Sequence, residues 1–483
     1  MPDFFEILNK DLAGRIGRLR TPHGVVETPV LMPVVNPHLR LIEPADLKRM
    51  GAEILITNSY IINQDPELKE LATKKGVHQL LGFDGPIMTD SGAFQLSVYG
   101  DIEVLPLEIL EFQRSIGSDI CVPLDIPTPP DVSRTRAESE LSETERRLYE
   151  AREFWDDGGP LLAGPIQGST YLDLRFGAAK RVKEIGFDVC PIGAVVPLME
   201  TYRFADLVDV VAASKKGLGP GSPVHLFGAG HPMMFALAAA LGCDLFDSAA
   251  YALYARQGRY LTTSGTLHLE NLKYLPCCCD VCRDRSPEDL AKDPDRIELL
   301  ARHNLFVSLA EIRQVRQSIW EGSLWELVER RCRSHPRILD GLRALASHAS
   351  WIESLDPASR STCFYLGPES AKRPEVVRYG SRIERIKLEG RVLVADPDFE
   401  EEEEGEGFDH VLWFKPPFGP YPKELAETAP LNAEVPAEAD GAGIAQALAN
   451  LKRLMEANPG ATFDLRLKDV PQDGSALDEV GGR

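Results

Sequence analysis

The chain has 483 residues, of which 43% are hydrophobic. This length suits a barrel-sized domain with a smaller one, and no apolar run reaches the roughly 18 residues needed to span a membrane. Nine cysteines are too few for a disulfide scaffold, and the N-terminus lacks the basic segment of a signal peptide, so we expect a cytoplasmic protein. The formal net charge of −21 argues at face value against a nucleic-acid partner, but the charge is uneven and does not decide the partner.

Eight short apolar segments in the first half of the chain are typical of buried strands. They lie at residues 28–34, 53–57, 86–90, 119–125, 161–167, 189–193, 224–228 and 244–247. Helical patterns lie between most of them, at residues 107–117, 142–155, 172–185 and 233–241. This alternation predicts an α/β fold of the (β/α)8, or TIM barrel, class. A doubly wound open sheet is the alternative, but no Gly-x-Gly-x-x-Gly sequence follows any strand.

The rest of the chain predicts two further parts. A cysteine-rich segment and long helices over about residues 294–355 would complete a catalytic domain at 1–355. Strand-like segments at 391–395 and 411–414 flank an acidic block at 396–409, which is typical of a solvated loop. A helix at 442–457 precedes a polar tail. We therefore expect a smaller α+β domain over residues 356–483.

Four of the predicted strands end on an acid or an amide, namely Asp90, Asp125, Gln167 and Asp247. Catalytic groups of α/β barrels lie just past the C-terminal ends of the strands, so these side chains predict one pocket. The alternative is that each caps the following helix. Two converging carboxylates suit chemistry at an anomeric carbon, where one attacks and the other moves a proton. On these residues alone, a sugar hydrolase and a glycosyl transferase fit equally well.

A metal site is predicted after the eighth strand. Cys277, Cys279 and Cys282 form a Cys-x-Cys-x-x-Cys sequence, and His303 follows on a predicted helix. Three thiolates and one imidazole predict a closed, structural Cys3His zinc site within segment 277–303. Cys278 is an alternative ligand at this stage, and reduced cysteines near an unrelated histidine are the other interpretation.

Several motifs are shared with a known family. Met-Thr-Asp-Ser-Gly-Ala-Phe-Gln at residues 88–95, Phe-Asp-Ser at 246–248 and the cysteine pattern with its histidine resemble the tRNA-guanine transglycosylase family. Residues 56–61, 122–131 and 364–370 are similar to its archaeal branch, and the resemblance covers about residues 5–435. It implies an enzyme that exchanges guanine at position 15 of the tRNA D-loop for 7-cyano-7-deazaguanine (preQ0), in archaeosine biosynthesis.

The resemblance also implies roles for individual residues. Asp247 would be the nucleophile towards the ribose C1′, and Asp90 the general acid and base. The implied base-binding residues are Asp125, Gln167, the stacking aromatic Phe94 and the segment Gly193, Ala194, Val195 and Val196, whose backbone N–H groups would face the cyano group. Core packing is the alternative for Phe94, and strand-end capping for Gln167. Arg256 and Arg259 are expected to contact RNA phosphates, with a solvated surface role as the alternative.

The implied partners are tRNA, preQ0, a second copy of the chain in a homodimer, and Zn²⁺. Archaeal members often end in an RNA-binding PUA domain, and the residues from 463 onwards are expected to be too few for one. A separate PUA-domain protein is therefore a candidate partner. Two functional alternatives stay open: a queuine-type enzyme acting at the anticodon wobble position, and a non-catalytic tRNA-binding subunit. The segment 193–196 lacks the glycine-rich pattern of the queuine-type branches, which favours preQ0.

Overall fold

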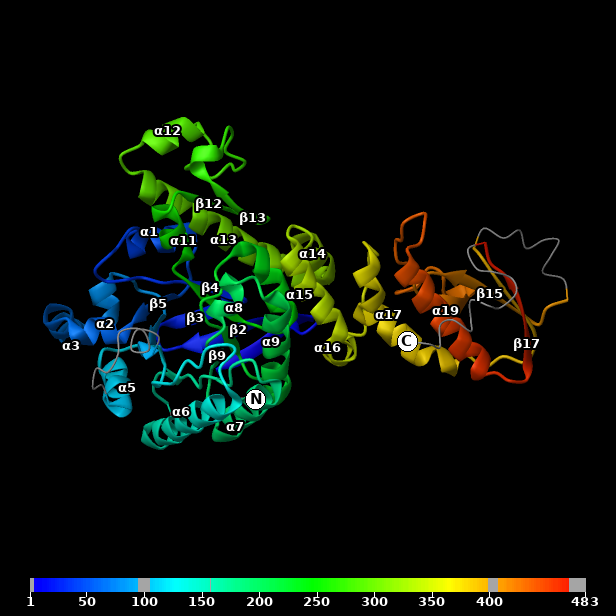
Figure 1. The fold of residues 1–483 in the computed structure, drawn as a ribbon, viewed down its shortest axis with the longest axis horizontal. Helices are drawn as coiled ribbons and strands as arrows, with labels where there is room; N and C mark the ends of the chain where they lie inside the picture. Colours follow the sequence, from blue (N-terminus) through cyan, green and yellow to red (C-terminus); the bar gives the residue numbers. More distant parts are fainter. Residues whose placement is uncertain (1–3, 94–104, 157, 398–406, 469–483) are drawn as a thin grey trace. The chain divides into compact units, whose positions relative to one another are not determined.

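The computed structural model describes residues 4–93, 105–156, 158–397 and 407–468 (Figure 1). It divides into two compact units, residues 1–345 and 346–483. The domain boundary between residues 355 and 356 stays a prediction. In the described part of the chain, no helix combines the length and the apolar character that crossing a bilayer would require.

Eight parallel strands lie at the centre of the first unit. They form two half-sheets, in the order β5-β6-β7-β8 and β4-β11-β10-β9. The strands are β4 (Val30–Pro33), β5 (Leu55–Asn58), β6 (Ile87–Asp90), β7 (Ile120–Cys121), β8 (Leu161–Leu162), β9 (Cys190–Ile192), β10 (Val224–Leu226) and β11 (Leu245–Ser248). Isolated parallel bridges join the half-sheets at both ends: Val34 pairs with Ile56 at one junction, and Ala163 with Val189 and Ile166 with Ile192 at the other. The strands thus follow one another in the cyclic order of a (β/α)8 barrel, and each overlaps one of the eight predicted segments.

Helices follow the strands and lie around them (Figure 1). They are α1 (Pro44–Met50), α2 (Ser59–Gln64), α3 (Pro66–Leu81), α5 (Pro106–Ser115), α6 (Arg134–Phe154), α7 (Leu172–Ile185), α8 (Val196–Glu200), α9 (Phe204–Leu218), the 3₁₀ turn η1 (Pro232–Met234), α10 (Phe235–Ala240) and α11 (Ala250–Arg256). The helix predicted at 142–155 begins earlier, at Arg134, because Ser133 accepts a hydrogen bond from the Arg136 N–H and caps its first turn. The predicted start at 233 is instead a 3₁₀ turn that contains Pro232.

An antiparallel sheet precedes the barrel and was not predicted. Its strands are β1 (Phe5–Asp11), β2 (Gly14–Thr21) and β3 (Gly24–Thr28). Phe5, Leu19 and Val26 on these strands are buried in the same apolar cluster as the barrel residues Met32 and Met88. The sheet leads directly into β4, so it covers the amino ends of the barrel strands, opposite the predicted site.

A buried carboxylate fastens this sheet to the barrel. Asp119, which precedes β7, accepts hydrogen bonds from His23 Nδ1 at 2.9 Å, His78 Nε2 at 3.0 Å and the backbone N–H of Ile87 at 2.7 Å. Burial acts to raise the pKa of Asp119, but the bonds from His78, Ile87 and His23 outweigh it and hold the pKa below its usual value. The charged form of Asp119 is therefore the form that stabilises the fold.

Replacing Asp119 by Asn is expected to lower the free energy of unfolding by about 3 kcal/mol at pH 7. The reason is that the hydrogen bonds from His23, His78 and the Ile87 N–H would lose their charged acceptor. The folded-state pKa lies below the unfolded value, so this contribution is present above about pH 4 and is lost as the pH falls further. Urea unfolding of wild type and Asp119→Asn at pH 7 and pH 3 measures this contribution as the difference between their free energies of unfolding. A difference that is the same at both pH values would contradict the expectation.

A second group of elements follows α11 in the first unit. It consists of the hairpin β12 (Arg259–Thr262) and β13 (Gly265–His268), the turn η2 (Leu269–Asn271), and helices α12 (Pro287–Lys292), α13 (Arg296–Glu321), α14 (Leu324–Cys332) and α15 (Pro336–Ser347). In Figure 1 the hairpin and α12 lie beside α13, and β12 and α13 are in contact. This group carries the predicted metal ligands.

The second unit is a small α+β structure. Its mixed sheet has the order β16-β15-β14-β17, with β14 parallel to both β15 and β17. Its elements are α16 (Ala349–Leu355), η3 (Pro368–Lys372), α17 (Pro374–Arg382), η4 (Ile383–Arg385), β14 (Gly390–Ala395), β15 (His410–Lys415), β16 (Gly419–Pro422), η5 (Lys423–Leu425), α19 (Gly441–Glu456) and β17 (Ala461–Arg466). The prediction that a polar tail follows the last helix was wrong over 461–466, because β17 pairs with β14 as a half-exposed edge strand. Most of the acidic block, residues 398–406, lies outside the described residues.

Candidate active site and metal centre

The four polar residues predicted at strand ends all lie at the carboxyl edge of the barrel. Asp90 is the last residue of β6 and Asp247 lies in β11, while Asp125 and Gln167 follow β7 and β8. Asp125 and Gln167 are hydrogen-bonded to each other. The charges of Asp125 and Asp247 both act on Asp90. The structure therefore brings together side chains that are widely separated in the sequence.

The surroundings of Asp90 raise the pKa of its carboxyl group to near neutral pH. Burial is the largest cause that raises its pKa, to about 7, and the charges of Asp125 and Asp247 add to it. The backbone N–H groups of Gly92 and Ser91 act in the opposite direction. Asn58, which lies beside Asp90 in the register of β5 and β6, donates from Nδ2 to Asp90 Oδ2 at 3.2 Å. A carboxyl group poised in this way can both give and take a proton at neutral pH.

Asp247 is bound through one of its two oxygens. His225 Nε2 lies 2.9 Å from Asp247 Oδ1, and the Gly228 N–H donates to the same oxygen at 2.7 Å. The side chain of Asp247 is 13% exposed, whereas that of His225 is fully buried. A carboxylate that is fixed on one side and accessible on the other is suited to act as a nucleophile.

Asp125 and Gln167 form a buried polar pair. Gln167 Nε2 donates to Asp125 Oδ2 at 2.7 Å, and burial raises the pKa of Asp125 above its usual value. Gln167 Oε1 is buried and has no partner among the described residues. An unpaired buried acceptor is costly, so this oxygen is suited to accept a hydrogen bond from a ligand. Gly193 makes room for this arrangement, since a Cβ there would lie 2.2 Å from Gln167 Nε2.

The segment 193–196 connects β9 to α8 and presents backbone rather than side-chain polar groups. Ala194 has a positive φ of 56°, an unusual conformation for a residue other than glycine. No hydrogen bond between described residues has the N–H of Ala194, Val195 or Val196 as its donor. These three N–H groups directly follow Gly193, which lies against Gln167, and they have no partner within the described structure.

The remaining predicted residues of the site lie elsewhere. Phe94 lies outside the described residues. Arg256 is exposed at the end of α11, and the guanidinium of Arg259 lies over the Tyr254 ring, 5.1 Å from its centre. Neither arginine is bonded to the four strand-end residues.

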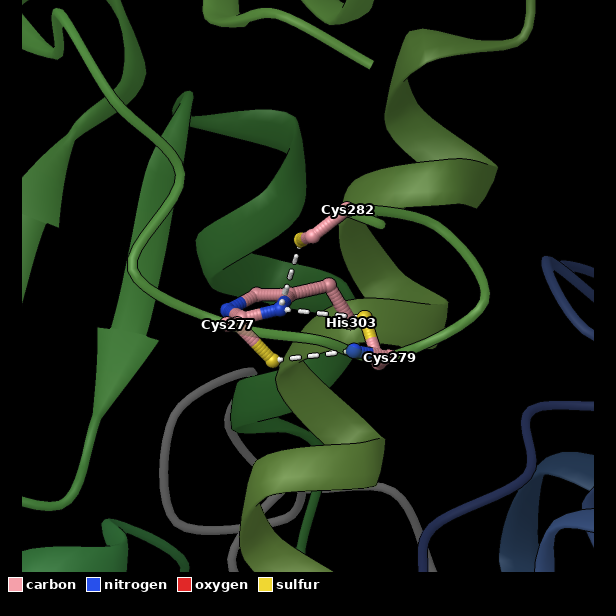
Figure 2. Close-up of side chains that lie close together, drawn as sticks. All are labelled: Cys277, Cys279, Cys282 and His303. Carbon is pink, nitrogen blue, oxygen red and sulfur yellow. Dashed lines mark hydrogen bonds between the residues drawn. The ribbon is translucent and has the colours of Figure 1, made fainter. Parts of the chain in front are cut away.

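The four predicted metal ligands converge. Cys277, Cys279, Cys282 and His303 place their donor atoms within 4.8 Å of one another. Figure 2 shows the three thiols and the imidazole gathered at one point. His303 Nδ1 lies 3.3 Å from Cys282 Sγ and 3.6 Å from Cys279 Sγ. Cys278 is exposed and does not belong to the cluster.

The surroundings of His303 suit a metal ligand. Its Nε2 lies 3.0 Å from the carbonyl oxygen of Leu261 on β12, which fixes the proton on Nε2 and leaves the Nδ1 lone pair facing the thiols. Tyr260 stacks on the imidazole with ring centres 3.6 Å apart, and its hydroxyl lies 3.4 Å from Cys282 Sγ. This cluster can hold a metal such as zinc.

Comparison with known proteins identifies the family. A family model described as "Queuine tRNA-ribosyltransferase" matches residues 11–337, a range that contains the four strand-end residues and all four cluster ligands. The chain belongs to the tRNA-guanine transglycosylase family. A transglycosylase of Methanosarcina mazei is 60% identical over 96% of this chain and 94% of its own length. One of Haloferax volcanii is 54% identical over 99% and 92%, and one of Archaeoglobus fulgidus is 48% identical over 96% of each chain. All three carry the name tRNA-guanine(15) transglycosylase.

Sequence analysis did not find three groups that contact the strand-end carboxylates Asp90 and Asp247. Asn58 bonds Asp90, and His225 and the Gly228 N–H bond Asp247. A signal was present for the two side chains: Asn58 directly follows the strand predicted at 53–57, and His225 is the single polar residue in the apolar run at 224–227. Nothing in the sequence marks the Gly228 N–H, because a backbone donor has no residue-type signature.

Proposed function

We propose that this chain is a tRNA-guanine(15) transglycosylase that replaces guanine with 7-cyano-7-deazaguanine through a covalent intermediate. The relatives that carry this name match it over nearly its whole length. The observation that carries the chemical part of the proposal is the pairing of Asp247, held through one oxygen, with Asp90, whose pKa is raised to about 7.

In the first half of the reaction Asp247 attacks the ribose C1′ of the target guanosine. A bond forms between the carboxylate oxygen and C1′ while the bond from C1′ to guanine N9 breaks and its electron pair leaves with the base. Protonated Asp90 supplies a proton to the departing guanine. The RNA is then held as a ribosyl ester of Asp247.

In the second half the incoming base reverses these steps. Asp90, now a carboxylate, takes the N9 proton of 7-cyano-7-deazaguanine, and N9 attacks C1′ as the ester bond to Asp247 breaks. Formation of the ester removes the Asp247 charge that raised the pKa of Asp90. Two displacements at C1′ retain its configuration, and no energy source is required because one glycosidic bond replaces another.

The base is bound by the groups next to the carboxylates. Asp125 and Gln167 would bond the amine and ring edge of a guanine-like base, with the buried Gln167 Oε1 as an acceptor that has no partner in the described structure. Of the predicted segment 193–196, the N–H groups of residues 194–196 would face the cyano nitrogen, whereas the Gly193 N–H donates to the carbonyl oxygen of Ile166. Phe94 is proposed to stack on the base, and Arg256 and Arg259 to contact RNA phosphates. A base buried in folded tRNA must first be unstacked, at a cost of a few kcal/mol.

We further propose that the cluster at residues 277–303 holds one structural Zn²⁺ per chain. Cys277, Cys279, Cys282 and His303 would occupy all four tetrahedral positions, so the metal would fasten the hairpin to α13 and take no part in the reaction. A homodimer, a separate PUA-domain protein and a cytoplasmic location remain predictions.

Replacing Cys279 by Ala is expected to abolish stoichiometric zinc binding, because a closed site loses one of four ligands. Metal content of the purified protein by mass spectrometry should fall from about one zinc per chain to well below half, and the melting temperature should drop. Cys278→Ala is the matched control, since Cys278 is exposed and outside the cluster, and it should keep its zinc. Equal zinc content in both variants would contradict the site.

The function is tested by exchange of radiolabelled guanine into unmodified tRNA. Label should enter wild-type reactions when position 15 is guanine and should be absent when that position is changed. Incorporation that survives this change but requires the wobble guanine would place the chain with the queuine-type enzymes. Binding of tRNA with no incorporation at all would favour a non-catalytic subunit.

A further inference from the structure

Two donors contact the same oxygen of the Asp247 carboxylate. His225 Nε2 and the backbone N–H of Gly228 lie 2.9 Å and 2.7 Å from Oδ1. Among the described residues, no donor is bonded to Oδ2. We propose that His225 is a positioning residue that holds Oδ1 and leaves Oδ2 as the oxygen that attacks the ribose. This inference rests on the proposed function.

The strand register places His225 where it can do this. In the parallel pairing of β10 and β11, His225 lies opposite Leu245. Asp247 follows Leu245 by two residues, so its side chain points to the same face of the sheet as that of Leu245. The Phe227 ring packs edge-on against the imidazole, with centres 4.5 Å apart. The orientation of His225 is thus set by the sheet and by its neighbours.

The hydrogen bonding of His225 also defines what it does not do. An ionised carboxylate only accepts hydrogen bonds, so the proton of the imidazole lies on Nε2. Nδ1 is buried and has no partner among the described residues. A proton relay needs a second polar partner on the far side of the ring, so His225 orients Asp247 and does not pass protons to or from it.

Gly228 supplies the second donor through a conformation that requires glycine. Its φ is +68°, and a Cβ at this position would lie 2.3 Å from the Val196 side chain. The turn after β10 can therefore bring the Gly228 N–H to Asp247 and still pass close to the segment proposed to bind the base. The same turn therefore donates a hydrogen bond to Asp247 and packs against Val196 of the segment proposed to bind the base.

Holding Oδ1 has a consequence in both halves of the reaction. When Oδ2 bonds to C1′, Oδ1 becomes the carbonyl oxygen of the ester and still accepts from both donors. When the incoming base displaces the ester, the returning negative charge is shared with Oδ1, where the two donors stabilise it. His225 therefore orients Asp247 for attack and assists its departure from C1′.

The test compares His225→Leu, which has no donor, with His225→Gln, whose amide can donate. In guanine exchange, His225→Leu is expected to lower kcat by about 10- to 100-fold, the value of one hydrogen bond to a charged group, with KM for tRNA unchanged. His225→Gln should recover most of the rate, because its amide can donate to Oδ1 in place of the imidazole.

The matched control is His78→Gln, which alters an imidazole–carboxylate bond of similar length at the amino end of the barrel. It should reduce thermal stability and leave kcat for guanine exchange unchanged. A His225→Leu kcat equal to that of the wild type would overturn the inference. So would a loss of rate that comes with a raised KM for tRNA and no recovery in His225→Gln, since that pattern indicates a purely structural role. Absence of exchange by wild type would instead overturn the proposed function, and this inference with it.

Discussion

Asp247→Asn is expected to lose guanine exchange by about 10⁴-fold or more, because an amide cannot form the ribosyl ester on which both halves of the reaction depend. Asn keeps the size of the side chain and an oxygen that can accept from His225 and Gly228, so the fold should persist. The covalent product also disappears: denaturing gels of wild type with tRNA should show a slower band, and gels of Asp247→Asn should not.

Asp244→Asn would be an unsuitable control for this variant, since Asp244 pairs with the buried Arg15 and its replacement is expected to destabilise the fold. The exposed Asp173 on α7 provides a better one, and Asp173→Asn should retain both exchange and the slower band. Exchange by Asp247→Asn within tenfold of wild type would assign the nucleophile to another residue.

Asp90→Asn is expected to lose about 10²- to 10⁴-fold in exchange rate, the usual contribution of a general acid and base. It should also become more stable than wild type in alkaline solution. The folded pKa of Asp90 is about 7 against an ordinary value of 3.8, so the folded state binds more protons than the unfolded state between these values. Wild-type stability therefore falls as the pH rises through this window, and Asn removes that cost.

Urea unfolding at pH 4 and pH 8 separates this effect from a general change in packing. The gain of Asp90→Asn over wild type should be about 4 kcal/mol at pH 8 and small at pH 4, where Asp90 is protonated in the folded state. A variant that is inactive and less stable at both pH values would show that Asp90 is a structural carboxylate, and would remove it from the mechanism.

Much of the barrel was predictable because its signal is local. A buried parallel strand is a short apolar run, and an acid at the end of such a run marks the carboxyl edge. Asp90 and Asp247 were found in this way. The strands β1 and β17 were missed because they carry no apolar run, being half-exposed strands that a neighbouring strand stabilises. Their existence depends on pairing with distant residues, which a local pattern does not contain.

The electrostatics of the site were not predictable for a related reason. The pKa of Asp90 depends on its burial and on two charges from other strands, at distances that only the fold sets. The role inferred for His225 depends on which oxygen it contacts, and one histidine within an apolar strand is more typical of a packed core. The metal ligands were easier to predict, because three cysteines within six residues of the chain lie close to one another in any fold.

The seams between the two half-sheets have a consequence for how the site works. Asp90, Asp125 and Gln167 belong to the β5–β8 half, whereas His225, Asp247 and the segment 193–196 belong to the half that contains β9–β11. The proposed nucleophile and the proposed proton donor therefore lie on different half-sheets, which are joined by backbone hydrogen bonds such as those from the Val35 N–H to the Ile56 oxygen and from the Ile166 N–H to the Pro191 oxygen. A base that bonded Gln167 on one half-sheet and residues 194–196 on the other would add further hydrogen bonds across this junction. We therefore expect a bound base to help fix the spacing between the two carboxylates.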